Sequence, residues 1–172
     1  VLILPTNSTL NSRSEVNLYR KFQFKNNISF DGIPIIAANM TSVGTLDVYK
    51  TLSKYKIITA LHKFHTLKDI VNYNNFNPNN NLDPNYFMLS TGISDNDYEN
   101  IVHILDNIEC KFILVDIANG YIQNMKIFVT KLRKKYPYKI IVAGNVTTKE
   151  GVIDLIESGA DIIKCGIGGG SA

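Results

Sequence analysis

The chain has 172 residues, of which 45% are hydrophobic and 19% are charged, a composition typical of a globular protein and unlike that of a disordered one. The net charge of +3 is small, and basic residues are not interleaved with aromatic ones, which argues against nucleic-acid binding. No apolar run approaches the length of a membrane span, and Cys110 and Cys165 are too few for a disulfide framework, so we expect a reducing, cytoplasmic compartment.

The first part of the chain reads as a lead-in to a later core. Residues 1–31 are polar and interrupted by residues that favour turns. The alternation Phe22-Gln23-Phe24 predicts one short strand at residues 20–25. We therefore interpret residues 1–31 as a segment that caps or flanks a core, and residues 32–172 as a single domain.

From Gly32 onward, apolar runs alternate with stretches whose apolar residues recur at helical spacing. The runs, each predicted to be a buried strand, cover residues 33–38, 57–61, 86–89, 112–115, 139–143 and 161–165. The helices predicted between them cover residues 45–54, a segment that opens with Thr66 and Asp69 spaced as in a capping box, residues 95–107, a segment that ends near Tyr136, and residues 148–158. Buried strands that alternate with helices indicate a parallel α/β sheet, because parallel strands need crossover connections and the helices cover both faces.

Each predicted strand ends in polar or glycine residues, which is where a TIM barrel places its active site. A doubly wound open sheet is the alternative, but it gathers functional residues near one switch point, whereas here they follow every strand. The pattern favours about six of the eight units of a TIM (β/α)8 barrel. We therefore expect an incomplete barrel from a larger catalytic domain, and we expect its open edges and uncovered apolar faces to make it poorly soluble alone.

Three further stretches carry structural expectations. The asparagine-rich residues 72–85 are too polar for a core and predict an exposed connection before the third of these strands. The basic cluster at residues 131–135 is typical of the solvated end of a helix, where cations also suit the helix dipole. Cys165 is embedded in an apolar strand, so we expect a buried structural thiol rather than a nucleophile.

Polar residues near three strand ends are candidates for chemistry. His62 and Lys63 follow the second strand and would meet an anionic ligand at the barrel mouth, unless they are ordinary surface groups. Asp116 follows four apolar residues, and its carboxylate would either orient a ligand amide or amine or serve in a turn. Residues 168–171 offer backbone amides to a phosphate or carbonyls to a cation. No nucleophile–base pair and no zinc-binding cluster is recognisable.

Several ordered motifs resemble those of the GMP reductases, which are relatives of the IMP dehydrogenases. They are Gly32-Ile33-Pro34-Ile35-Ile36-Ala37-Ala38-Asn39-Met40, Thr59-Ala60-Leu61-His62-Lys63, Asp116-Ile117-Ala118-Asn119-Gly120-Tyr121, Ala143-Gly144-Asn145-Val146 and Ser158-Gly159-Ala160-Asp161-Ile162-Ile163-Lys164. The likeness covers essentially the whole chain. Two features resemble the reductases rather than the dehydrogenases: no regulatory domain is inserted after His62-Lys63, and Asn119-Gly120-Tyr121 stands where the dehydrogenases have a version with histidine.

The resemblance implies a cytoplasmic, homotetrameric TIM-barrel enzyme that uses NADPH to convert GMP to IMP and ammonia through a covalent thioimidate on a cysteine. The nucleophilic cysteine is expected directly after Ala172, so that Cys165 is not its counterpart. Lys63 and Asp116 are implied to support the reaction near the reacting base. An IMP dehydrogenase-like oxidoreductase and a non-catalytic nucleotide-binding remnant are the alternatives.

The resemblance also implies binding roles by position. The cofactor-contact positions are Ser12, Arg13, Lys63, Asp116, Ile117, Ala118, Ile167 and Gly168, of which Ser12 and Arg13 reach the NADPH of a neighbouring subunit. Asn39, Met40 and Ser171 fall on substrate positions, and the backbone of Gly168 and Gly170 falls on the family's potassium-binding turn. Three residues depart from the family pattern: Thr41 replaces an aspartate, Ile93 replaces a small hydroxyl residue near the ammonia site, and Gly169 replaces a proline. The change at Ile93 is the one expected to touch the chemistry.

Overall fold

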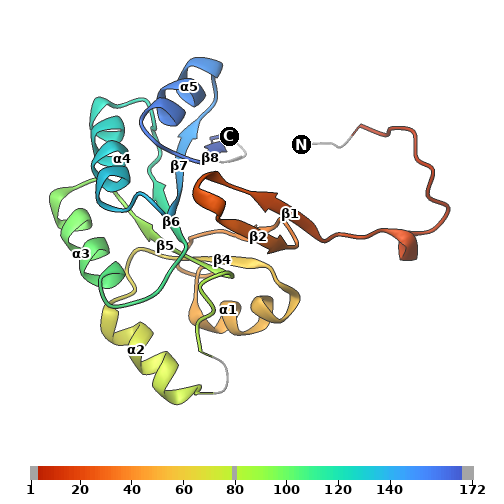
Figure 1. Ribbon diagram of the computed structural model, residues 1–172, viewed down its shortest axis with the longest axis horizontal. Helices are drawn as coiled ribbons and strands as arrows, with labels where there is room; N and C mark the ends of the chain where they lie inside the picture. Colours follow the sequence, from red (N-terminus) through yellow and green to blue (C-terminus); the bar gives the residue numbers. More distant parts are fainter. Residues whose placement is uncertain (1–3, 79–80, 168–172) are drawn as a thin grey trace.

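Residues 4–78 and 81–167 are described by the structure, a computed structural model of the chain. Within these ranges, six parallel strands form one sheet, with helices on one side of it and a separate hairpin on the other (Figure 1). The strands are β3 (Ile36–Ala37), β4 (Ile58–Leu61), β5 (Phe87–Thr91), β6 (Phe112–Asp116), β7 (Ile140–Val146) and β8 (Ile162–Cys165). The helices are α1 (Leu46–Leu52), α2 (Leu67–Phe76), α3 (Asp95–Leu105), α4 (Gln123–Lys135) and α5 (Lys149–Glu157), with short 3-10 turns η1 (Arg13–Glu15), η2 (Lys25–Asn27) and η3 (Ser53–Tyr55).

The strands lie in the sheet in the order in which they occur along the chain, from β3 to β8. A doubly wound sheet changes direction at a switch point, whereas a barrel adds each new strand beside the last one. The sequence-based prediction of a partial α/β barrel is therefore confirmed, and the described residues form an open half-barrel.

Both faces of the sheet are apolar, and alternate residues of each strand supply the two faces. The outer face packs under the helices through residues such as Leu61, Leu89 and Ile141. The inner face carries a second buried cluster that includes Met88 and Leu114. Continuous apolar runs predict this arrangement, because a strand that is covered on both sides is mostly apolar, although Thr59, Ser90 and Thr91 are buried in β4 and β5.

Side-chain caps fix where several helices begin. Thr66 and Asp69 form the capping box that the sequence predicts at α2, and Ser94 and Asp97 form a second one at α3. Thr148 caps α5 with its side chain alone. These caps hold the loops that follow the carboxyl ends of the strands, which is the edge where the candidate site lies.

A hairpin covers the opposite end of the half-barrel. It consists of β1 (Arg20–Gln23) and β2 (Ser29–Gly32), which pair in antiparallel register. Phe30 of β2 is buried, and its ring centroid lies 6.3 Å from that of Phe112 and 6.4 Å from that of Tyr86. Since Phe112 is the first residue of β6, the hairpin covers the amino-terminal end of the inner face. The sequence predicts β1 but not β2, which holds a single large apolar residue.

The prediction that residues 72–85 form an exposed connection is wrong for part of that stretch. Helix α2 extends into it, and the side chains of Tyr73 and Leu82 are buried. The backbone amide of Asp83 donates a hydrogen bond to the Tyr49 hydroxyl at 2.6 Å, which anchors the stretch to α1. The asparagines lie among apolar residues that keep helical spacing, so the polar composition hides a helix with one buried face.

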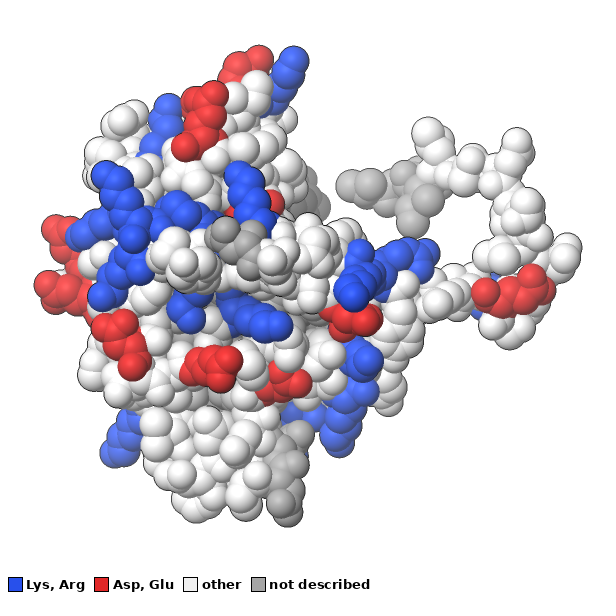
Figure 2. Space-filling view, viewed as in Figure 1, with Lys and Arg blue, Asp and Glu red and all other residues white. Residues whose placement is uncertain are grey.

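The basic cluster at residues 131–135 is only partly solvated. Figure 2 shows the cations gathered over α4, and the Lys131 ammonium lies 3.6 Å from the centre of the Tyr98 ring. Arg133, however, points inward and donates to backbone carbonyls beyond its own helix. The prediction is therefore wrong for Arg133, because the chain folds back after α4 and brings the start of β7 and the loop before β8 against that side chain.

The two outermost strands of the sheet are less covered than the others. β3 is shorter than its apolar run because the Ile35 amide donates to the Ile33 carbonyl at 2.7 Å and closes a turn. Ile36 in β3 remains 43% exposed. At the other edge, Cys165 is exposed, so the expectation of a buried thiol is wrong. The reason is its place on β8, which has a strand neighbour on one side only within the described residues.

Candidate active site

Asp116 joins the carboxyl ends of four strands. Its Oδ2 accepts a hydrogen bond from Asn39 Nδ2 at 2.8 Å. Its Oδ1 accepts from Lys164 Nζ at 2.8 Å and from Asn145 Nδ2 at 3.3 Å. The donors come from the loop after β3, from β8 and from β7. Because β3 and β6 are not neighbours in the sheet, the bond to Asn39 crosses the mouth of the half-barrel.

Side-chain alternation and strand register explain why Asp116 faces the mouth. Phe112 and Leu114 precede it at two-residue spacing on β6, and both belong to the inner apolar cluster. The register pairs Asp116 with Gly144 of β7, and Gly144 with Lys164 of β8. These positions therefore form one row across three strands, and the row brings a carboxylate and an ammonium to the same side.

The loop after β6 is fastened to the end of β7 by backbone hydrogen bonds. The Ile117 amide donates to the Gly144 carbonyl at 3.0 Å, and the Gly120 amide donates to the Asn145 carbonyl at 2.8 Å. A Cβ atom at Gly120 would lie 2.6 Å from that same carbonyl, so the close approach requires glycine. Asn145 Oδ1 is buried and has no hydrogen-bond partner among the described residues, which leaves one acceptor at the site for a ligand.

Lys63 lies at the same edge but is held by another carboxylate. Its Nζ is 3.4 Å from Asp97 Oδ1, and its side chain is 43% exposed. The ring of His62 stacks on that of His65 with a centroid distance of 3.9 Å, and burial lowers the pKa of His65. Lys63 therefore lies at the barrel mouth as an accessible cation. Within the described residues, Lys63 does not donate a hydrogen bond to Asp116.

The other predicted site residues divide into three groups. Ala118, Met40 and Ile167 are exposed at the strand ends. Ser12 and Arg13 lie in an exposed segment that extends away from the sheet (Figure 1). Gly168, Gly170 and Ser171, the predicted potassium and phosphate positions, lie outside the described residues.

Ile93, which departs from the family pattern, is half-buried and packs against the outer apolar cluster. It also borders a surface cavity between α3 and α4, together with Phe128. Its side chain therefore contributes to the helical layer beside the barrel mouth.

Three polar residues of the site were not singled out from the sequence. Asn145 and Lys164 bind Asp116, and Asp97 binds Lys63. A usable signal existed for Lys164, because it follows the inward-facing Ile162 at two-residue spacing. Asp97 was recognisable only as a residue of a helix start, which is one of its two roles.

The hydroxyl of Tyr121 forms a second polar centre near this edge. It accepts hydrogen bonds from the backbone amides of Thr147 and Thr148 at 2.7 and 2.9 Å. The hydroxyl groups of both threonines also lie within hydrogen-bond distance of it. The hydrogen bonds, with that of the Thr147 side chain as the largest cause, lower the pKa of Tyr121 to about 8.

This shift predicts a pH dependence. Between about pH 8 and pH 10, folded Tyr121 has lost its proton while the unfolded side chain keeps it, so the free energy of unfolding should rise with pH across this window. Below pH 8 both states are protonated and the contribution is absent. A phenolate absorbance titration of the wild type minus that of Tyr121→Phe should show one group with a midpoint near 8. If the group seen in the difference between the two titrations has the ordinary tyrosine pKa of about 10, the lowered pKa assigned to Tyr121 is wrong.

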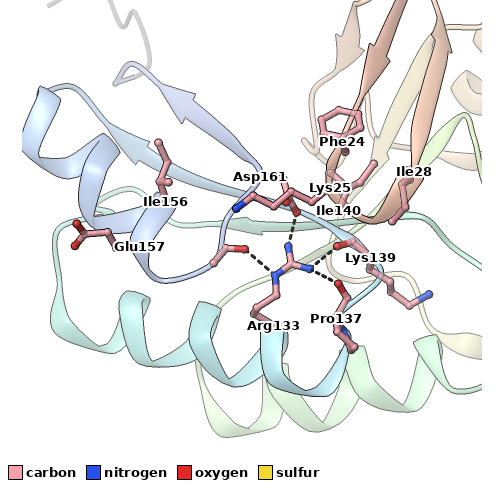
Figure 3. Close-up of a pocket in the computed structure, with 11 residues that line it drawn as sticks. Phe24, Lys25, Ile28, Arg133, Pro137, Lys139, Ile140, Ile156, Glu157 and Asp161 are labelled. Atoms are coloured by element: carbon pink, nitrogen blue, oxygen red, sulfur yellow. Dashed lines mark hydrogen bonds and ion pairs between the residues drawn. The ribbon is translucent and has the colours of Figure 1, made fainter.

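A cavity of about 250 Å³ lies at the amino-terminal end of the sheet, away from Asp116. Figure 3 shows Arg133 at its centre, with its guanidinium directed at Asp161 and at backbone carbonyls. The donors of this side chain are engaged within the protein, as the dashed lines indicate. We therefore assign the cavity a structural role and place the candidate active site at the opposite, carboxyl-terminal edge.

The parallel strands in chain order, with polar residues gathered at their carboxyl ends, define the class of β/α-barrel proteins. Residues 1–172 match the model of the IMP dehydrogenase / GMP reductase domain, and the chain belongs to this family. It is 46% identical to "GMP reductase" of Klebsiella pneumoniae and 46% identical to "GMP reductase 2" of Homo sapiens, over 99% of this chain in each case. It spans 49% of each of these relatives, about half of their length.

A solved structure has the same fold. The chain superimposes on the crystal structure of inosine 5′-monophosphate dehydrogenase from Legionella pneumophila with a TM-score of 0.77 and 26% sequence identity. The match covers 99% of this chain and 50% of that protein. The half-barrel thus corresponds to part of a dehydrogenase of the same family.

Proposed function

We propose that the chain is part of a longer polypeptide that catalyses the NADPH-dependent reductive deamination of GMP to IMP and ammonia. Identity of 46% to two GMP reductases over 99% of the chain supports this reaction over the dehydrogenase reaction. The observation that carries the proposal is the Asp116 carboxylate, held at the barrel mouth by donors from three other strand ends. Barrel enzymes of unrelated chemistry place their reacting groups at this edge.

The residues at the mouth fit a nicotinamide dinucleotide. NADPH, when bound, supplies the hydride that reduces the base. The free acceptor Oδ1 of Asn145 suits an amide donor such as a carboxamide, and the Asp116 carboxylate offers further acceptor positions beside it. Lys63, exposed at the same edge, provides positive charge for an anionic ligand. Ile117 and Ala118 place backbone next to Asp116 at the predicted cofactor positions.

Other parts of the proposal rest on the family resemblance. Ser12 and Arg13 reach the cofactor of a neighbouring subunit in a cytoplasmic homotetramer, and their exposed segment leaves them accessible for this role. Asn39 and Met40 contact the nucleotide, with Asn39 fixed by Asp116. Ser171 holds the phosphate, and the backbone of Gly168 and Gly170 holds potassium. Among the described residues, no helix is long and apolar enough to cross a bilayer.

Neither cysteine of the chain suits the covalent step. Cys110 is buried, and desolvation raises the pKa of its thiol to about 11, which disfavours the reactive thiolate. Cys165 is paired in register with Val146, a residue of the outer cluster, so it lies on the face away from the mouth. The nucleophile therefore belongs to the sequence that we propose follows Ala172.

The experiment compares residues 1–172 with the polypeptide extended by the codons that follow Ala172 in the gene. NADPH oxidation that requires GMP, followed by loss of NADPH absorbance, is expected for the extended polypeptide only, because covalent catalysis needs a positioned thiolate. Turnover by residues 1–172 would contradict the placement of the nucleophile. A stop codon directly after Ala172 would favour the non-catalytic remnant. A continuation that resembles Cys-Thr-Thr would favour the enzyme.

The role of Asp116 gives a sharper prediction. In the extended polypeptide, Asp116→Ala should lower kcat/KM by about 100-fold or more, because it removes a preorganised charge at the site and frees three donors. The matched control is Asp106→Ala, which removes an aspartate from an exposed ion pair with Lys135. The control should keep its activity within about threefold of the wild type, since exposed pairs contribute little. Equal losses in both variants would contradict the assigned site.

A further inference from the structure

Three residues form a row at the carboxyl ends of neighbouring strands. Asp116 of β6 pairs with Gly144 of β7, and Gly144 pairs with Lys164 of β8. In such a row the two outer residues are separated by a whole strand. Their side chains nevertheless meet, with Lys164 Nζ 2.8 Å from Asp116 Oδ1. The Lys164 side chain therefore crosses β7 at the position of Gly144 and brings its ammonium to Asp116.

Gly144 has no room for a side chain. A Cβ atom built there would lie 2.4 Å from the Lys164 carbonyl oxygen and 2.7 Å from the Lys164 Cβ. Any residue other than glycine would push β8 away from β7 or displace the base of the Lys164 side chain. The missing side chain at Gly144 thus leaves the space through which Lys164 reaches Asp116.

The contact to Lys164 completes the environment of the carboxylate. Asn39 and Asn145 donate neutral hydrogen bonds to Asp116, whereas Lys164 supplies the positive charge. The Asp116 side chain is 17% exposed and the Lys164 side chain 41% exposed. A partly exposed ammonium thus contacts Oδ1 of a mostly buried carboxylate.

We propose that Lys164 is a positioning residue that holds Asp116 in its working orientation, and that Gly144 is required because it opens the path between them. This rests on the proposed function, since the orientation matters only if Asp116 faces the reacting nucleotide and cofactor. Lys164 acts through Asp116, and the proposal gives it no contact with the substrate.

The test uses the extended polypeptide and four variants. Lys164→Met should lower kcat by about 10-fold to 100-fold with a smaller change in the KM for GMP, because a misplaced carboxylate impairs the reaction more than nucleotide binding. Lys164→Arg should recover most of the loss, since it restores a cation of similar reach. Gly144→Ala should behave like Lys164→Met. The matched control, Lys126→Met, breaks a 2.9 Å ion pair between α4 and α5 and should leave kcat unchanged.

A second measurement separates this proposal from the proposed function. A double-mutant cycle of Asp116→Asn and Lys164→Met on the denaturant midpoint of unfolding needs no turnover. Non-additive effects support the pair even if the wild type fails to reduce GMP, in which case only the proposed reaction is overturned. Additive effects, or an unchanged kcat in Lys164→Met, or no recovery by Lys164→Arg, overturn the positioning role of Lys164.

Discussion

Replacing Arg133 by alanine is expected to lower the free energy of unfolding by about 2 to 4 kcal/mol. The guanidinium donates to the backbone carbonyls of Gly159 and Lys139 at 2.9 and 2.8 Å, and it forms an ion pair with Asp161. Asp161 in turn accepts a hydrogen bond from the Ile141 amide at 2.9 Å. One side chain thus ties the end of α4 to the start of β7 and to the loop before β8 (Figure 3).

The size of this effect follows from what the truncation leaves behind. Asp161 would keep its charge with its side chain only 12% exposed, and several carbonyls would lose their donor. A fully buried charge that loses its partner costs about 3 to 5 kcal/mol, and the 24% exposure of the Arg133 side chain places this pair somewhat lower. The methylene groups of Arg133 also pack against Gly159, where a Cβ atom would lie 2.8 Å from the Arg133 Cγ.

Two variants serve as controls for this prediction, measured by denaturant unfolding of the extended polypeptide. Arg133→Lys keeps the charge but not the planar fork, so it should recover only part of the loss. Lys135→Ala, two residues further along α4, breaks an exposed ion pair with Asp106 and should change the unfolding free energy by less than about 1 kcal/mol. Equal effects of Arg133→Ala and Lys135→Ala on the free energy of unfolding would contradict the stabilising role assigned to the hydrogen bonds and ion pair of Arg133.

The sequence predicts those features that depend on local periodicity. All six strands of the sheet and the helices between them follow from apolar spacing, and the capping box at Thr66 follows from two residues three positions apart. The position of Asp116 at the barrel mouth also follows, because the apolar residues before it fix the strand and its end. These predictions need no knowledge of which segments meet in space.

The features that the sequence does not predict depend on partners far along the chain. Arg133 reads as a solvated cation at a helix end, and Lys164 as a residue of an apolar strand, until the fold brings Asp161 and Asp116 beside them, 28 and 48 residues away respectively. Cys165 reads as a core residue because an apolar strand is assumed to have neighbours on both sides, whereas β8 has one within the described residues. Composition misleads in the asparagine-rich stretch, where Tyr73 and Leu82 pack inward.

The inner face of the half-barrel leads to the second prediction, which concerns residues 1–172 expressed alone. An apolar groove of about 350 Å³ opens on this face, and its lining includes Phe22, Ile36, Ile58 and Ile162. Ile36 and Phe22 are 43% and 44% exposed, and the β3 and β8 edges have unpaired positions within the described residues. Exposed apolar faces beside open strand edges favour association, so we expect most of the protein to sediment as oligomers or aggregates.

A charge placed in the groove should reverse this behaviour. Ile36→Lys puts an ammonium on the edge strand and inside the apolar lining, which opposes edge-to-edge pairing and should shift most of the material toward monomer. The matched control is Ile127→Lys, which adds the same charge at a 56% exposed isoleucine on the outer surface of α4. The control should associate like the wild type, because it raises the net charge equally without touching the groove. Sedimentation velocity distinguishes the three proteins, and a monodisperse wild-type monomer that melts cooperatively would rule out the inner face as an association surface.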